Sequence, residues 1–274
     1  MATVNTNVGA MVALQALNKT QSDLSQVQSR INTGLAVANA KDNGAVFAIA
    51  QNMRADVASY NAVGQSLDRG QSTVDVAMAA GEAISDLLIE MKEKALAASD
   101  TSLDADSRAA LNEDFSALRD QISTIVANAS FNGINLVDGT TANIQALANE
   151  DGSGRITVSG ENLSLAGTVV TLATNATINT TATASTAIAT VDASLNNVNR
   201  ALARLGTGSK ALDIQSTFVS KLSDSLRAGI GNLVDADMAM ESARLQSLQV
   251  KQQLGIQALS IANSAPSMVL GLFR

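Results

Sequence analysis

The chain has 274 residues with a net charge of −7, 46% hydrophobic and 2% aromatic residues, and neither Cys nor His. Its length suggests one or two domains, with cores built mainly from Ala, Leu, Ile, Val and Met, which suit helices. The acidic balance argues against nucleic acid as a partner, and no apolar run is long enough to span a membrane.

The first predicted helix covers residues 1–33. Apolar residues recur on one of its faces, but Gln21 and Gln28 occupy seam positions between them. Because polar seam residues weaken helix pairing, we expect this helix to be marginal on its own. The apolar residues of the face include Leu14, Leu17, Leu24 and Ile31. Small residues, two Gly and an Asp-Asn-Gly turn signal make residues 33–44 a connector.

Residues 45–98 keep a nearly seven-residue apolar rhythm, which predicts a long helix. Residues 99–104 predict a turn that ends in helix-capping residues, and a further helix follows to about residue 129. A strict heptad over several turns implies left-handed supercoiling against a neighbouring helix.

The middle of the chain changes to turn signals and short β-branched runs. Phe131-Asn132-Gly133 predicts a turn, and the Asp-Gly pairs at 138–139 and 151–152 are hairpin signals. Residues 155–172 predict a sheet of two or three short strands, so the β region spans about 131–172.

A stretch of Thr, Ala and Asn at residues 173–187 is too small and polar to form a core. From about Ala187 the helical periodicity resumes. Taken locally, Gly206 and Gly208 predict a break or kink in this helix.

The last stretch, residues 235–274, predicts one helix with two opposed apolar stripes. A helix buried only in its own domain needs a single stripe, so the pattern favours a partner on each side. Pattern alone leaves open an ordinary core helix of a large bundle. The first stripe contains Met240, Ala243, Ser247, Val250, Leu254, Ala258, Ile261, Ala265 and Met268. The second contains Met238, Leu245, Leu248, Ile256 and Leu259.

Together these elements predict a mainly α fold. We expect a long coiled-coil-like helical rod with nested N- and C-terminal helices and a small β-hairpin region mid-chain. The two termini lie together if the long helical arms pair antiparallel.

Candidate chemical sites are weak throughout the chain. Without Cys or His, the usual nucleophile–base pairs and metal ligands cannot be assembled. Asp235 and Asp237 are better explained as caps of the last helix than as metal ligands. Residues 206–210 are glycine-rich and end in Lys210, but they lack phosphate-loop spacing. We therefore expect no enzyme activity, cofactor or metal.

Motifs in order at both ends of the chain resemble bacterial flagellin, and the match covers nearly the whole sequence. The short length and small middle resemble the alphaproteobacterial type, which keeps two inner domains. The matching motifs are residues 30–35, 40–45, 131–139, 235–239 and 262–266, followed by Leu270, Leu272 and Arg274.

The resemblance implies a structural subunit that self-assembles into the bacterial flagellar filament for swimming motility. Residues 1–45 with 232–274 would form the inner paired-helix core domain, and residues 46–231 the outer helical domain with the β region. It also implies a helix that stays unbroken through Gly206, and we follow the resemblance there.

Several partners follow from the same resemblance: other flagellin copies in a homopolymer or mixed filament, the flagellar export apparatus, a flagellin chaperone, and filament cap and junction proteins. No nucleic acid or membrane is expected. The filament is extracellular, and the N-terminus lacks a basic region followed by an apolar run, so we expect export without a cleaved signal peptide.

Two sets of site residues follow. The self-assembly interface is expected at Leu14, Leu17, Leu24, Ile31, Val250, Leu254, Ile256, Leu259, Ile261 and Met268. O-linked glycans are expected in a hydroxyl-rich region, at some of Ser164, Thr168, Thr171, Thr174, Thr177, Thr180, Thr181 and Thr183. The alternative for this region is a bare polar loop whose Thr residues serve strand propensity.

Two alternative functions would use similar amphipathic helices. A hook–filament junction protein of the same fold would share the inner domains without forming long filaments. A membrane-surface amphipathic protein would need a basic polar face with Trp or Phe on the apolar face. This chain is acidic and has no Trp, which argues against the second alternative.

Overall fold

A computed structural model describes residues 6–271, with side chains for residues 6–264. The chain divides into two compact units, which we call unit 1 (Met1–Ala55 and Ser225–Arg274) and unit 2 (Asp56–Asp224). The described part is mainly helical with small antiparallel strand pairs, which confirms the predicted fold class. None of its helices combines the length and apolar character that a membrane crossing requires.

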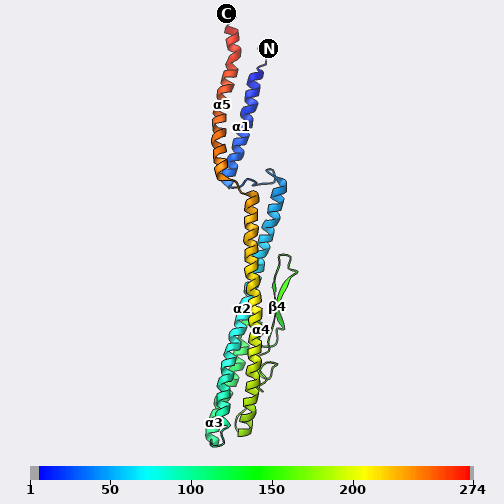
Figure 1. The fold of residues 1–274 in the computed structure, drawn as a ribbon, viewed down its shortest axis with the longest axis vertical. Helices are drawn as coiled ribbons and strands as arrows, with labels where there is room; N and C mark the ends of the chain where they lie inside the picture. The colour runs from blue at the N-terminus through cyan, green and yellow to red at the C-terminus, as the bar shows by residue number, and fades with distance from the viewer. Residues whose placement is uncertain (1–5, 272–274) are drawn as a thin grey trace. The chain divides into compact units, whose positions relative to one another are not determined.

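Unit 1 is built on two helices from opposite ends of the chain, α1 (Val8–Thr33) and α5 (Met238–Gly271). They lie side by side, blue and orange in Figure 1. α1 starts at Asn7, whose side chain accepts a hydrogen bond from Ala10 N, and ends at Gly34. Gly34 has φ +72°, a left-handed conformation that glycine adopts without strain. The predicted first and last helices, and the connector that follows the first helix, are therefore present.

Unit 2 contains most of α2 (Gly44–Ala98) and α4 (Thr181–Val234), together with α3 (Ala105–Asn128). In this unit α2 and α4 run antiparallel. Lys92 of α2 forms an ion pair with Asp192 of α4, whereas Gly70, earlier on α2, lies against Leu212, later on α4. Asp104 caps α3, since its carboxylate accepts a hydrogen bond from Ser107 N.

Two small hairpins complete unit 2: β1 (Ser130–Phe131) pairs with β2 (Ile134–Asn135), and β3 (Asn143–Leu147) with β4 (Arg155–Ser159). Asn132 and Gly133 join the first pair with φ of +51° and +78°. Positive φ at both turn positions is the geometry that an Asn-Gly hairpin turn adopts, so the turn predicted at residues 131–133 is present and joins a hairpin.

The core of unit 2 is one continuous cluster. Apolar side chains from all three helices, the hairpins and the segment between β4 and α4 contribute to it. The largest fully buried residues are Phe115, Leu67, Ile84, Leu88, Met91, Ile122, Leu136, Leu163, Leu172, Ile178, Leu205 and Leu212.

The local prediction of a break at Gly206 and Gly208 is wrong, because α4 runs unbroken through both. A Cβ on Gly208 would lie 2.7 Å from Cγ1 of Val158 in β4, so this glycine gives the hairpin room to pack on the helix. The glycine signal reflected a close approach between two elements and not the end of a helix.

The β region is also smaller than predicted, since only residues 155–159 of 155–172 form a strand. The segment after β4 donates single hydrogen bonds to the loop after β2, from Glu161 N to Leu136 O and from Leu163 N to Val137 O. Its apolar side chains fill the core without forming a ladder. Residues 173–187 also contribute to the core, against prediction, through Ile178 and Ala184.

Candidate functional site

The most unusual surface of unit 1 is the apolar stripe that α5 leaves uncovered. Met240, Val250, Leu254 and Ile261 are 55–67% exposed. They belong to the first of the two predicted stripes. A helix that packs only within its own domain needs one apolar face, so a second apolar face left exposed is unusual. Exposed apolar area of this kind tends to mark a contact surface.

The opposite side of α5 faces α1. Leu248 is buried there against Leu24 and Val27, and Leu245 and Ile31 pack partly buried beside them. This cluster is small, so apolar burial alone gives the pair limited stability.

Polar contacts spaced along α1 and α5 fix their antiparallel register. The Asn7 amide donates to Ala262 O at 2.7 Å, and Gln252 Nε2 donates to Gln21 Oε1 at 2.6 Å. At the other end, Arg30 forms an ion pair with Glu241 at 3.0 Å. The Glu241 side chain is buried, and its second oxygen, Oε2, has no partner among the described residues.

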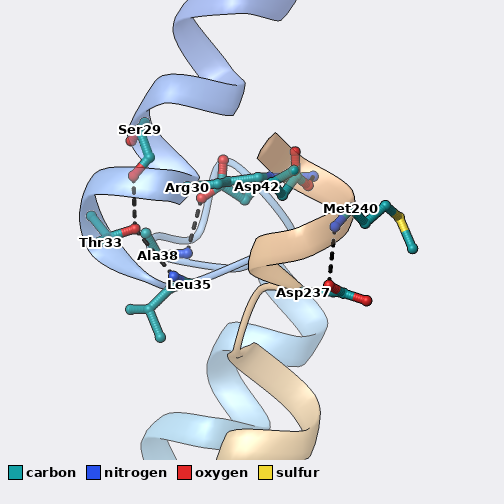
Figure 2. Close-up of polar contacts among 9 residues, drawn as sticks. Ser29, Arg30, Thr33, Leu35, Ala38, Asp42, Asp237 and Met240 are labelled. Atoms are coloured by element: carbon teal, nitrogen blue, oxygen red, sulfur yellow. Dashed lines mark hydrogen bonds and ion pairs between the residues drawn. The ribbon is translucent and has the colours of Figure 1, made fainter. Parts of the chain in front are cut away.

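The connector after α1 is held by backbone and carboxylate contacts, some of which Figure 2 shows. Asp42 Oδ2 accepts hydrogen bonds from Ala38 N and Asn39 N, which closes the loop on itself. Ala36 N donates to Val234 O at 2.7 Å, and Ala236 N donates to Gly34 O at 2.8 Å. The motif segments 30–35 and 235–239, from opposite ends of the chain, therefore meet in one joint of unit 1.

The start of α5 lies at the same joint. Asp237 Oδ1 accepts hydrogen bonds from Ala239 N and Met240 N, the second of which is drawn in Figure 2. Asp237 is thus the predicted helix cap. Within the described residues, no cluster of three or more acidic side chains could hold a metal ion. The joint positions two helices, and its contacts are structural.

The predicted interface residues occupy three kinds of environment. Leu24 is buried in the α1–α5 pair, and Leu17, Ile31 and Leu259 are half-buried. The Met268 side chain lies outside the described residues. The exposed members are Leu14, Val250, Leu254, Ile256 and Ile261.

The predicted glycan acceptors differ in whether their hydroxyls form hydrogen bonds within the chain. The hydroxyls of Ser164, Thr171, Thr180 and Thr183 are engaged within the chain. Thr168 and Thr174 are exposed, and among the described residues their hydroxyls have no partner; Thr177 and Thr181 are half-buried.

Sequence reasoning missed exposed apolar side chains on unit 2. Ile89 and Leu96 on α2 and Ile214 and Phe218 on α4 are all more than half exposed. The signal was present in the heptads, because these residues fall out of phase with the buried positions of the same helices.

Comparisons with known proteins agree over both ends of the chain. The family model described as the bacterial flagellin N-terminal helical region matches residues 4–142, and that of the C-terminal helical region matches residues 188–273. The chain is 59% identical to flagellin FljK of Caulobacter vibrioides, covering 99% of this chain and 98% of that protein. It is 38% identical to a flagellin of Brucella melitensis over the full length of both.

Solved structures share the fold at lower identity. A crystal structure of Bacillus cereus flagellin is 22% identical with a TM-score of 0.50, covering 56% of this chain and 88% of that one. A putative flagellar hook-associated protein from Vibrio parahaemolyticus is 13% identical with a TM-score of 0.59, covering 71% and 100%.

The family models and full-length relatives favour a flagellin over the hook–filament junction alternative. The chain therefore belongs to the bacterial flagellin family, as a short flagellin of the alphaproteobacterial type and a structural subunit of the extracellular flagellar filament.

Proposed function

We propose that the copies of this subunit contact one another in the filament through the α1–α5 pair, with the exposed stripe of α5 at the centre of the contact. The observation that carries the proposal is the stripe itself, which includes Val250, Leu254 and Ile261. Burying one such side chain contributes about 1.5–3 kcal/mol relative to leaving it in water. Several together supply a strong drive to assemble once neighbouring copies cover them.

The exposed fractions of the side chains divide the proposed interface into contacts within one copy and contacts between copies. Leu24 joins α1 to α5 inside one copy, with the half-buried Leu17, Ile31 and Leu259 at the edge of that contact. The exposed Leu14, Val250, Leu254, Ile256 and Ile261 then meet other copies. Met268 is proposed to continue this surface.

Each of the two predicted domains has a separate role in the proposed function. Residues 1–45 with 232–274 act as the inner assembly domain, and residues 46–231 as the outer domain that carries the β region. Unit 2 supports this division, because its buried core lies within residues 63–219 and the apolar side chains packed against that core all belong to unit 2.

Further partners are proposed from the family. The subunit leaves the cell through the flagellar export apparatus without a cleaved signal peptide, accompanied by a flagellin chaperone, and meets filament cap and junction proteins. The chain has no Cys, so no disulfide can form on the way. The role is mechanical, with no enzymatic step.

O-linked glycans are proposed on the hydroxyl-rich region of unit 2. Thr168 and Thr174 are the best supported acceptors, because each is exposed and keeps its hydroxyl out of hydrogen bonds within the described chain. Intact-mass measurement of native filaments tests this: a mass equal to the bare polypeptide contradicts it.

Self-assembly itself is tested by electron microscopy of purified protein after salting-out, with and without filament seeds. Helical tubes that elongate from seeds are the expected result. Monomers that stay soluble even with seeds would instead fit a junction protein.

A further inference from the structure

The outer face of α2 in unit 2 carries apolar side chains framed by carboxylates. Ile89 and Leu96 are 53% and 60% exposed, and the surrounding acidic residues are exposed as well. Steps of three, four and seven residues place all of them on one helical face. We call this the acidic strip: Glu82, Asp86, Ile89, Glu90, Glu93 and Leu96.

The acidic strip has no cation of its own. Lys92 and Lys94 lie nearby on α2, but Lys92 pairs with Asp192 at 2.6 Å and Lys94 with Asp114 at 2.7 Å. Among the described residues, none of the four carboxylates of the strip forms an ion pair. Lys94 also interacts electrostatically with Glu90 and Glu93 at one edge of the strip, but four carboxylates against this one shared cation leave the strip with a net negative charge around an apolar centre.

A second face, on α4, has the opposite charge. Ile214 and Phe218 are 60% and 55% exposed, one turn apart. Lys210 lies one turn before them and Lys221 one turn after, both exposed and without an ion pair in the part of the chain that is described. We call these four residues the basic strip. Asp213 and Asp224 lie farther round the helix, so acidic residues border it on one side only.

Each strip has the composition of a small interface, an apolar centre with a charged rim. The two cannot meet within one copy. Ile89 lies level with about Leu195 on α4, given the Lys92–Asp192 pair. The middle of the basic strip is about 20 residues farther along α4, or roughly 30 Å at ~1.5 Å per residue.

We propose that, in the filament, the basic strip of one copy docks on the acidic strip of a second copy, displaced by roughly 30 Å along the helices of unit 2. This contact rests on the proposed self-assembly and adds a second, electrostatic contact to the apolar one in unit 1. It joins two different surfaces, so each copy can bind a neighbour on both sides. Such head-to-tail contacts generate open helical arrays.

Charge reversal tests the pairing. Lys210→Glu with Lys221→Glu, or Glu90→Lys with Glu93→Lys, is expected to raise the critical concentration for seeded elongation by about tenfold or more, because like charges then face each other. A chain carrying all four changes is expected to regain elongation near the wild-type value. Arg200→Glu and Glu113→Lys, at exposed positions elsewhere in unit 2, serve as matched controls.

The possible outcomes separate the two proposals. The pairing would be overturned if the double variants elongate like the wild type. It would also be overturned if the chain carrying all four substitutions stays defective in elongation while its monomer melts normally. Failure of the unmodified chain to elongate from seeds would instead contradict self-assembly itself.

Disulfide trapping provides a second measurement that does not depend on growth rate. The chain has no Cys, so Ile89→Cys and Phe218→Cys can be introduced in separate copies without background. Mixed filaments under oxidation are expected to yield disulfide-linked dimers containing one of each variant. Filaments of either variant alone should yield few dimers, and equal yields in all three samples would contradict the pairing.

Discussion

Unit 1 and unit 2 use their apolar residues in opposite ways. Unit 2 closes a continuous cluster of 31 buried residues, whereas the α1–α5 cluster of unit 1 has three. Their charges also differ: unit 1 has eight Lys and Arg against five Asp and Glu, and unit 2 has ten against twenty, giving +3 and −10. Unit 2 closes a large core within one copy, although it also exposes the apolar centres of the two charged strips. Unit 1 has little core of its own and exposes an apolar stripe, which we propose other copies cover.

The largest expected effect separates assembly from folding. Leu254→Asp should abolish seeded elongation, because an unpaired carboxylate buried in the contact costs several kcal/mol. Unit 2 should remain folded, as circular dichroism of the monomer would show. Gln121→Asp introduces the same charge at an exposed position of α3 in unit 2, outside every proposed contact, and should elongate. Normal filaments from Leu254→Asp would show that the stripe is not buried.

Core truncations should have different consequences in the two units. Leu88→Ala removes a fully buried side chain from unit 2 and should lower the free energy of unfolding of the monomer by about 2–5 kcal/mol. Leu24→Ala, in the small cluster of unit 1, should leave the main melting transition almost unchanged and raise the critical concentration instead. Calorimetry of the monomers and seeded growth measure both, and equal losses of melting stability would contradict the distinction.

The two glycines of α4 should respond to alanine with opposite sign. Gly206 has no atom within 4 Å of a built Cβ, so Gly206→Ala should stabilise unit 2 by about 1 kcal/mol through helix propensity. Gly208→Ala brings a methyl group to 2.7 Å from Val158, so overpacking of about 1–3 kcal/mol should exceed that gain. Chemical denaturation measures both, and two stabilising substitutions would mean that the hairpin does not rest on Gly208.

The smallest expected effect concerns the β3–β4 hairpin tip. Tyr60 donates a hydrogen bond to Glu150, which, with burial and nearby carboxylates, raises the pKa of Tyr60 from 10.0 to about 12. Since folding favours the neutral phenol, its stabilisation is full below pH 10.0 and is lost as pH rises towards about 12.

Because Tyr60 is the only Tyr in the chain, tyrosinate absorbance reports this titration directly. Glu150→Gln should move the midpoint down towards the ordinary value. An unchanged midpoint would show that the hairpin tip does not lie against α2 as described.

Sequence periodicity predicted the long helices because the heptads are continuous over many turns. Residue types at helix starts also identified the caps Asp104 and Asp237, because each side chain accepts a hydrogen bond from a backbone N–H three residues later. It could not explain Gly208, whose cause is Val158, 50 residues away in the sequence.

The candidate site was likewise predictable where it depends on local sequence, and not where it depends on contacts between distant segments. Two opposed stripes on α5 follow from its own sequence, but which one α1 covers depends on register contacts such as Asn7 to Ala262. Likewise, β-branched residues after β4 suggested strands, while tertiary packing decides the single hydrogen bonds that Glu161 N and Leu163 N donate to another loop.

Hydrogen exchange of the monomer and the filament tests most directly the claim that unit 1 is completed by its neighbours. We expect the amides of α1 and α5 to exchange quickly in dilute monomer and to become strongly protected in filaments. The core amides of unit 2 should be protected in both. Strong protection of α1 and α5 already in the monomer would contradict the account.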